Sequence, residues 1–366
     1  MSRDLSWRNF DFLLLGAIVL ATAFGVAMIR SAVAGNDQLT PLVARQIYFA
    51  IGGIMAIFIV AAIDYRYWLA LYRPIYIVMM ILLFALFLSA TAVFGSARWF
   101  QVGVLFIQPT EFAKIVVILI LARYFDSTQN QPRNISWLVR AFLWVFFLAI
   151  WILLQPNLSN VIVILVIFFA MLWINGLDIR QLLIIIVSVL ALAFIAFPFL
   201  QPYQQQRVLN FIIPQSNVSY GATYNVEQAL IAIGSGGWFG KGYGHGTQTQ
   251  LRFLKVRHTD FIFSAAAEEF GLIGAVVVIL VEIFIVWRCI RAAQKARDVS
   301  GAMIAYGVAI LLFFQGMANI AVNLKLIPVS GLPLPFISYG GSGLASLMLG
   351  VGLVESVVMR HKPMEF

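Results

Sequence analysis

Residues Phe12-Leu-Leu-Leu-Gly-Ala-Ile-Val-Leu-Ala-Thr-Ala-Phe-Gly-Val-Ala-Met-Ile29 contain no charged side chain, and this run decides the fold class. A helix that crosses a lipid bilayer needs roughly 20 mostly apolar residues. Arg3 and Arg8 precede the run and Ser31–Ala34 is similar to a signal-peptidase site, but the run is longer than the apolar core of a signal peptide. We therefore predict an uncleaved first span over residues 12–30.

The same apolar character continues along the chain. Of the 366 residues, 62% are hydrophobic and 11% are charged, against about 25% charged residues in an average soluble domain. Such a composition needs the bilayer as solvent. We predict an all-α polytopic membrane protein, a single domain over residues 1–366, with about ten transmembrane helices at residues 12–30, 46–63, 74–94, 111–125, 138–154, 158–175, 181–199, 262–287, 303–323 and 340–358. Pro156 separates the fifth helix from the sixth, because proline disrupts a helix interior.

The Lys and Arg residues predict the orientation of these spans. Ten spans put both termini on one side, and short cytoplasmic loops carry an excess of Lys and Arg. Placing both termini in the cytoplasm assigns 14 of the 24 basic residues to that side. A long outer loop, about residues 201–261, then joins the seventh and eighth spans. Its basic residues are Arg207, Lys241, Arg252, Lys255 and Arg257.

Long loops inside a compact domain are usually functional or disordered. Aromatic, Ile and Leu residues throughout this loop predict that it is ordered on the membrane surface. Within it, glycine fills seven of the thirteen positions from Gly234 to Gly246. Glycine can expose backbone amides to an anion, and Lys241 adds a charge. The segment is not a P-loop, because Gly242 follows the lysine, and an anion cradle and a turn-rich connector fit it equally well.

The loop ends in Leu251-Arg-Phe-Leu-Lys-Val-Arg-His-Thr-Asp260, where three cations and a histidine precede one carboxylate. Cations at the outer surface suit a phosphate-bearing substrate, and Asp260 is a candidate catalytic base. The candidate substrate contacts here are Arg252, Lys255, Arg257 and His258. The alternative is that Asp260 pairs with Arg257 and caps the eighth helix.

Charged residues inside the membrane are functional candidates, because each is costly in hydrocarbon. Glu111 and Lys114 are three residues apart on one face of the fourth span, so they either satisfy each other or meet substrate. In the second case Lys114 contacts the substrate and Glu111 orients it. Arg98 lies in the outer loop just before this span.

Polar residues also recur at helical spacing in two later spans. In the ninth span they are Gln315, Asn319 and Asn323. Such a seam is more often helix–helix glue than a pathway. Asp260, Ser264 and Glu268 would share one face if the eighth helix began early, and Glu268 is a further candidate substrate contact. Glu282, deep in the eighth span, has no assigned role.

No cofactor or metal site is evident. The three histidines lack ligand spacing, and the single cysteine, Cys289, excludes a cysteine cluster and an intramolecular disulfide. A divalent cation beside a pyrophosphate is chemically allowed. The basic residues form short clusters between apolar runs, which argues against a nucleic-acid partner.

Motifs spread over nearly the whole chain match one known family. They are Arg98-Trp99, Gln108-Pro-Thr-Glu-Phe-Ala-Lys114, Gln155-Pro156, Ile233-Gly-Ser-Gly-Gly237, Gly240-Lys-Gly242, His245-Gly-Thr-Gln248, Arg257-His-Thr-Asp-Phe-Ile-Phe263, Glu268-Glu-Phe-Gly-Leu-Ile-Gly274 and Pro333-Leu-Pro-Phe-Ile-Ser-Tyr-Gly-Gly-Ser342. The chain thereby resembles the SEDS family of bacterial cell-wall synthesis, and its RodA branch more than its FtsW branch. One departure is Gln155-Pro-Asn-Leu-Ser-Asn160, where the family usually has Gln-Pro-Asp-Leu-Gly-Thr, so the acid is lost at Asn157.

The resemblance implies a ten-span protein of the bacterial cytoplasmic (inner) membrane with both termini cytoplasmic. It implies a peptidoglycan glycosyltransferase that polymerises lipid II into β-1,4-linked glycan strands outside the membrane. The implied partners are a class B penicillin-binding protein, which is a transpeptidase, and other membrane proteins of the elongation complex. Asp260 falls on the family's catalytic carboxylate, and Arg98, Glu111 and Lys114 fall on positions of the same cavity.

The implied chemistry fits the residues. Undecaprenyl pyrophosphate leaves readily once cations balance its charge, so the reaction needs no general acid, unlike glycoside hydrolysis with its two carboxyls. The acceptor hydroxyl needs a base, which predicts Asp260 as base and Lys114, Arg98 and the loop cations as pyrophosphate contacts. A transporter that flips lipid-linked precursors is the main alternative, but it needs polar groups through the bilayer depth. A non-catalytic scaffold would leave the clustering around Asp260 unexplained.

Overall fold

Helices make up nearly all of the described structure. The structure, a computed structural model, describes residues 7–89, 98–102, 105–199, 205–206, 209 and 222–361. Its long helices are α1 (Phe12–Val33), α2 (Pro41–Ala62), α4 (Tyr72–Ser89), α5 (Pro109–Ser127), α6 (Ile135–Leu154), α7 (Leu158–Ile174), α8 (Ile179–Ala196), α12 (Ile262–Gln294), α13 (Val299–Asn323) and α14 (Gly341–Val358). Shorter elements are η1 (Trp7–Asn9), α3 (Tyr65–Ala70), η2 (Phe197–Phe199), α10 (Ala222–Gly236) and α11 (Thr247–Gln250). The predicted all-α fold is confirmed.

Each predicted span corresponds to one long helix. The fourth and fifth, which the sequence leaves short, extend to 19 and 20 residues as α5 and α6. α6 ends at Leu154 and α7 begins at Leu158, so the chain breaks at Pro156 as predicted. The third predicted span, residues 74–94, continues beyond residue 89 into positions outside the described ranges.

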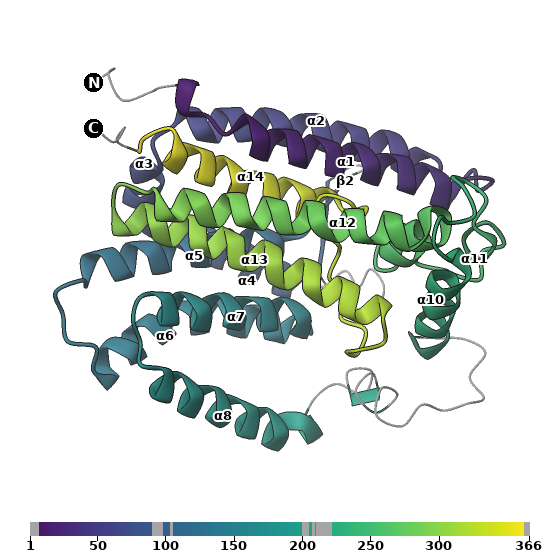
Figure 1. Cartoon of the computed structure of the whole chain (residues 1–366). Helices are drawn as coiled ribbons and strands as arrows, with labels where there is room; N and C mark the ends of the chain where they lie inside the picture. The colour runs from purple at the N-terminus through teal and green to yellow at the C-terminus, as the bar shows by residue number, and fades with distance from the viewer. Residues whose placement is uncertain are drawn as a thin grey trace.

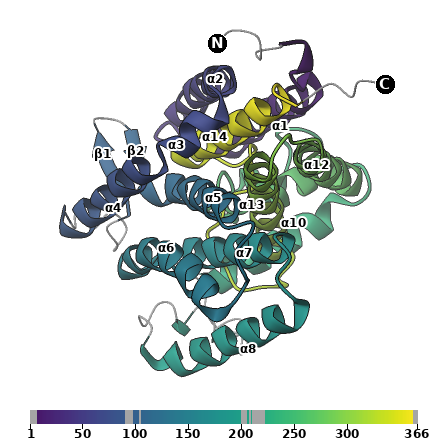
Figure 2. The ribbon, with the colours of Figure 1, turned by 90° about the vertical axis from the view of Figure 1, so that its left-hand side faces the viewer.

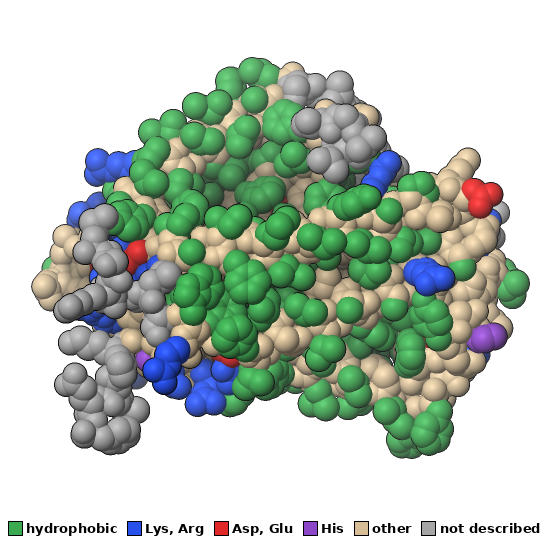
Figure 3. Space-filling view, turned by 90° about the horizontal axis from the view of Figure 1, so that it is seen from above, with side chains coloured by type: hydrophobic (Ala, Val, Ile, Leu, Met, Phe, Trp, Pro, Cys, Tyr) green, Lys and Arg blue, Asp and Glu red, His purple; other side chains and the backbone are tan. Residues whose placement is uncertain are grey.

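The long helices run alongside one another, with both chain termini at one end of the bundle and α10 and α11 at the other (Figure 1). We call these the terminal end and the loop end. Among the described residues, α1, α2, α6, α12, α13 and α14 are long and apolar enough to cross a membrane, and shorter apolar runs lie in α4, α7 and α8. Hydrophobic side chains cover the middle of the face in Figure 3, with Lys and Arg towards its ends. The protein is therefore a polytopic membrane protein.

α13 occupies the centre of the bundle, where it packs against α5, α7, α12 and α14 (Figure 2). α8 lies at the edge beside α7. Small residues let helix backbones approach closely in lipid. At Gly352 of α14, an added Cβ would lie 2.8 Å from Val60 Cβ in α2. Because α13 is surrounded by α5, α7, α12 and α14, its polar residues lie inside the protein and face these helices.

A short hairpin that the sequence did not predict precedes α5. Strands β1 (Phe100–Val102) and β2 (Leu105–Ile107) pair antiparallel. Ser342, at the start of α14, bonds to β2 and to the residue that joins β2 to α5. Its Oγ donates to Phe106 O (3.0 Å) and accepts from Gln108 N (2.9 Å). These bonds fix the first turn of α5 against α14.

α12 is broken near the loop end. Gly271 has φ 70° and ψ −166°, a left-handed conformation that favours glycine. The groups released by the break are satisfied by the glycine-rich loop: Leu272 N donates to Gly237 O (2.8 Å), and Lys241 N donates to Glu268 O (3.0 Å). The predicted span at residues 262–287 is thus a longer helix with a built-in interruption.

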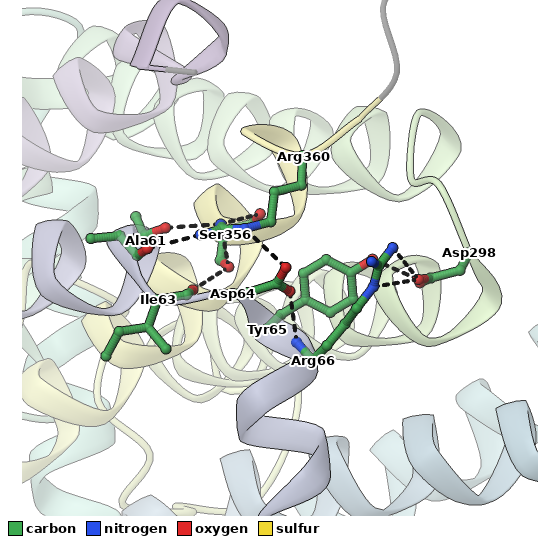
Figure 4. Close-up of polar contacts among 9 residues, drawn as sticks. Ala61, Ile63, Asp64, Tyr65, Arg66, Asp298, Ser356 and Arg360 are labelled. Carbon is green, nitrogen blue, oxygen red and sulfur yellow. Dashed lines mark hydrogen bonds and ion pairs between the residues drawn. The ribbon is translucent and has the colours of Figure 1, made fainter. Parts of the chain in front are cut away.

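At the terminal end, polar contacts join α2, α3, α13 and α14 (Figure 4). Arg360, just after α14, donates to carbonyls at the end of α2 and pairs with Asp64 (3.4 Å). Tyr65 Oη and Arg66 Nη2 both donate to Asp298 Oδ2, at 2.7 and 3.2 Å, and Asp298 caps α13. These bonds fix the terminal ends of α2, α13 and α14 relative to one another.

Candidate active site

Asp260 lies at the loop end, two residues before the first residue of α12. Its backbone carbonyl accepts two bonds from α13, from Asn319 Nδ2 (3.0 Å) and Asn323 Nδ2 (2.9 Å). Its side chain is half-buried and faces the loop before α14, where a Cβ on Gly331 would lie 3.9 Å from Asp260 Oδ2. Neutral amides therefore hold the backbone of Asp260 in place, and its carboxylate lies beside Gly331.

The three polar residues of α13 act as the predicted glue. Gln315 Nε2 donates to Pro333 O (3.1 Å), and Asn319 Nδ2 also donates to Leu332 O (2.8 Å). All three are buried. The α13 seam thus holds two separate loops, the one that ends at Asp260 and the one that precedes α14.

Glu111 and Lys114 form the predicted pair on α5. Lys114 Nζ lies 2.8 Å from Glu111 Oε2, and the two residues are 0% and 4% exposed, respectively. Lys114 Nζ also donates to Gln315 Oε1 (3.1 Å). The pair is therefore connected through Gln315 to the α13 seam, which holds Asp260. A buried ion pair is tolerated when further hydrogen bonds compensate its desolvation.

The predicted loop cations differ in what they contact. Arg257 is buried and donates to Ala32 O and, at 3.2 Å, to Leu254 O. Arg252 donates to Gly35 O, in the connection between α1 and α2. Both side chains thus tie the loop to the end of α1. Lys255 is exposed, and Arg207 lies outside the described residues.

His258 lies two residues before Asp260 and is half-buried. Burial, and secondarily the charge of Arg257, lowers the pKa of His258 to about 4, so its imidazole is neutral near pH 7. In the part of the chain that the structure describes, its Nδ1 is buried without a hydrogen-bond partner. The structure therefore gives His258 a buried, neutral ring, and contact with substrate stays a prediction.

Lys241 and Glu268 lie apart from this site, in a cluster of their own. Lys241 Nζ donates to Glu268 Oε1 (3.0 Å), Thr247 Oγ1 (2.7 Å) and Ser235 Oγ (2.8 Å), which uses its three donors. Glu268 is buried and also accepts from the amide and hydroxyl of Thr249. This pair holds the glycine-rich loop on α12, so the structure gives it a role in the fold, and contact with substrate stays a prediction.

Two interpretations of the sequence change accordingly. α12 begins at Ile262, after Asp260, so the condition for a common face of Asp260, Ser264 and Glu268 is not met. Instead, Ser264 Oγ donates to Asn323 Oδ1. The connector interpretation of the glycine-rich segment is favoured, because amides that an anion would need are bonded to the carbonyls of α12.

Comparison with known proteins identifies the family. The sequence model of the FtsW/RodA/SpoVE family, described as cell cycle protein, matches residues 6–363. The chain belongs to this family. Relatives include a probable peptidoglycan glycosyltransferase FtsW of Hydrogenovibrio crunogenus, 36% identical over 96% of this chain and 93% of the relative. Another is the peptidoglycan glycosyltransferase MrdB of Escherichia coli K12, 35% identical over 94% of this chain and 92% of the relative.

Solved structures agree with this assignment. A chain from a peptidoglycan synthase complex that coordinates polymerization and crosslinking has a TM-score of 0.81 and 28% identity, with 96% of this chain and 98% of that chain covered. RodA of Thermus thermophilus has a TM-score of 0.74 and 28% identity, over 98% and 99% of the two chains. The predicted enzyme class is confirmed: the chain is a peptidoglycan glycosyltransferase. FtsW and MrdB relatives are similar to it at nearly equal identity.

Asn157 and Asn160, where the chain departs from the usual family motif, make contacts at the start of α7. Asn157 Nδ2 and Asn160 Nδ2 both donate to Thr110 Oγ1, at 3.4 and 3.1 Å. Asn160 Nδ2 also lies 3.3 Å from Glu111 Oε1. Neutral amides thus tie the start of α7 to the start of α5, beside a buried carboxylate. The contact of Asn160 with Glu111 was missed at the sequence level, because only the fold brings these helices together.

Arg98 lies beside the same turn, where its Nη2 donates to Pro156 O. It therefore lies near the start of α5, as the family position implies. Among the described residues, no group of three or more His, Cys, Asp or Glu side chains could hold a metal ion. A divalent cation beside the pyrophosphate stays a possibility that the structure does not test.

Proposed function

We propose that this enzyme polymerises lipid II into β-1,4-linked glycan strands on the outer face of the cytoplasmic membrane. The observation that carries the proposal is the position of Asp260: a half-buried carboxylate at the loop end, whose backbone is held by Asn319 and Asn323. The proposal puts the loop end outside and both termini in the cytoplasm. The proposal keeps the chain as a single domain over residues 1–366, with the catalytic loop, about residues 201–261, at the outer surface.

Asp260 would act as the base that deprotonates the acceptor 4-hydroxyl as it attacks the donor sugar. The bond to undecaprenyl pyrophosphate breaks as the new glycosidic bond forms, so direct displacement inverts an α-linked donor to a β-linked product. Cations near the site balance the charge of the leaving group.

The pyrophosphate contacts can be ranked by accessibility. Lys255 is the most accessible, because its side chain is exposed, and Arg98 is half-buried with its Nη2 bonded to Pro156 O. Lys114 and Arg257 are buried and bonded within the protein, so each would serve first to position its neighbours. Lys241 has its three donors occupied by protein oxygens.

The proposed partner is a class B penicillin-binding protein, which would crosslink the strands as they are made. Support comes from the similar chain in a complex that coordinates polymerization and crosslinking. Membrane proteins of the elongation complex are further proposed partners. Co-purification with the transpeptidase encoded by the same organism tests this assignment, and failure to associate in the membrane contradicts it.

Asp260→Asn tests the mechanism. Purified protein in detergent, supplied with lipid II, should lose polymerisation by at least about 100-fold, the usual range for a lost general base. The melting temperature should change little, because asparagine has nearly the same size as aspartate and the bonds from α13 to the backbone carbonyl are kept. Asp126→Asn, at the terminal end, is the matched control. Full polymerisation by Asp260→Asn would remove this residue from the mechanism, and lipid II transport without polymerisation by the wild type would favour the transporter alternative.

A further inference from the structure

Two large aromatic side chains project from the glycine-rich loop. Trp238 is 69% exposed and Phe239 is 82% exposed. Single exposed apolar side chains are common on protein surfaces and need no explanation. Two adjacent large ones in an ordered turn indicate a contact surface. The loop bonds to the backbone groups that the break in α12 leaves unpaired, and this role does not require aromatic residues at these positions.

The turn that carries these residues is held rigidly. Trp238 O accepts from Ile273 N (3.2 Å), and Gly240 N donates to Gly236 O (2.8 Å). A Cβ on Gly236 would lie 2.1 Å from Ala267 O, so the loop backbone lies directly on α12. The two aromatic side chains are therefore presented at a fixed height along α12.

That height can be estimated from the length of α12. A helix crosses the hydrocarbon of a bilayer in roughly 20 residues. Gly271 and Arg291, both within α12, are separated by that length of helix. At the Arg291 end, the guanidinium groups of Arg288 and Arg291 lie 5.7 and 4.9 Å from the ring of Trp287. Such a tryptophan with cations is typical of a membrane–water interface. The opposite membrane–water interface then lies at the level of Gly271, where the loop that carries Trp238 and Phe239 is hydrogen-bonded to α12.

The face of α12 between these two levels is apolar and exposed. Its exposed large side chains are Leu272, Ile273, Val276, Val277, Leu280 and Ile283. In a membrane protein this face contacts lipid, and the loop aromatics continue it without a polar interruption at the break. Arg30, exposed in the last turn of α1, lies near Tyr243 of the same loop: burial raises the pKa of Tyr243, and the charge of Arg30 opposes this. A cation at this level complements a lipid phosphate.

We propose that Trp238 and Phe239 form an interfacial lipid anchor, which inserts at the boundary between headgroups and acyl chains of the leaflet at the loop end. The break at Gly271 makes this possible, because it lets the loop pack on α12 and supply the aromatic residues of that interface. Since the same loop is bonded to the first turns of α12, the anchor fixes the depth at which Asp260 faces the headgroup region. Lipid is chosen over a protein partner because the pair is continuous with the lipid-facing side of α12.

Depth measurement with a nitroxide label tests the proposal directly. Cys289, the single native cysteine, is buried, so an introduced cysteine can be labelled selectively. The full chain would carry Phe239→Cys, with Val277→Cys as lipid control and Asn130→Cys as water control, in nanodiscs of phosphatidylethanolamine and phosphatidylglycerol. We expect the ratio of oxygen to nickel-chelate collisions at position 239 to exceed that at 130 by at least about threefold and to approach that at 277. A ratio equal to that at position 130 overturns the proposal, including when protection appears only after a partner protein is added.

A second measurement separates lipid contact from folding. Trp238→Ser with Phe239→Ser removes the aromatic groups, and Trp238→Phe with Phe239→Leu is the matched apolar control. We expect the serine pair to lose at least half of the rise in melting temperature that lipid produces over detergent, while the apolar pair keeps it. An equal loss of stability in detergent and in lipid would show a merely structural role and would contradict the anchor.

Discussion

Asp260, Lys241 and Glu268, all at the loop end, were candidate site residues from the sequence, yet the fold surrounds Asp260 differently from the other two. At Asp260, neutral amides of α13 bind the backbone, and the carboxylate is left half-buried beside Gly331. At Lys241 and Glu268, the charged groups themselves make the structural bonds. The difference teaches that charged groups near the membrane surface can serve the fold itself, as Lys241 and Glu268 do, so that a charge alone does not indicate chemistry.

The buried pair on α5 belongs to the Asp260 region and should give the largest effect on stability. Lys114→Met leaves Glu111 charged and buried, which costs about 3–5 kcal/mol. It also releases Gln315 Oε1 and loosens the α13 seam, so polymerisation of lipid II should fall by more than tenfold. The double variant Lys114→Met with Glu111→Leu should recover much of the melting temperature. If the single variant melts like the wild type, the pair is not the structural support described here.

Gly240 tests the other region. Its φ of 79° is left-handed, and an added Cβ would lie 2.2 Å from Glu269 O. Gly240→Ala should therefore destabilise the protein by more than the about 1–2 kcal/mol of a left-handed alanine alone. Gly234→Ala, in α10, is the matched control, because nothing lies within 4 Å of its Cβ position and alanine favours a helix. A normal melting temperature for Gly240→Ala would show that the loop does not pack on α12 as described.

Lys241→Met separates structure from substrate binding at the same cluster. Loss of the ammonium leaves the buried Glu268 without its cation, which should cost about 1–3 kcal/mol, and Lys241→Met with Glu268→Gln should cost less. Polymerisation, normalised to folded protein, should stay within about threefold of the wild type, in contrast to Asp260→Asn. A variant with normal melting temperature and abolished polymerisation would return Lys241 to the substrate contacts and remove the contrast between the two regions.

Hydropathy and helical periodicity sufficed to predict the ten long helices, because bilayer thickness and helix rise constrain them. The i, i+3 spacing likewise predicted the Glu111–Lys114 pair, which is local. Contacts between distant segments were out of reach: Asn160 with Glu111, or the loop amides with the carbonyls of α12, depend on how helices are arranged. The break at Gly271 was missed because a glycine in an apolar run gives no sign of which loop will cover it.

The smallest effect concerns His258, two residues before Asp260. Burial lowers its pKa to about 4, whereas an unfolded chain has a histidine pKa of about 6.5. As pH falls from 6.5 towards 4, the unfolded chain therefore binds a proton that the folded protein does not, and stability declines. The melting temperature should drop between pH 7.5 and pH 5 by a few degrees more in the wild type than in His258→Gln, with the exposed His245→Gln as control. Equal drops in all three proteins would mean that His258 is not buried as described. A protonated His258 would also place a cation two residues before Asp260, so the same titration reports on the setting in which the base must act.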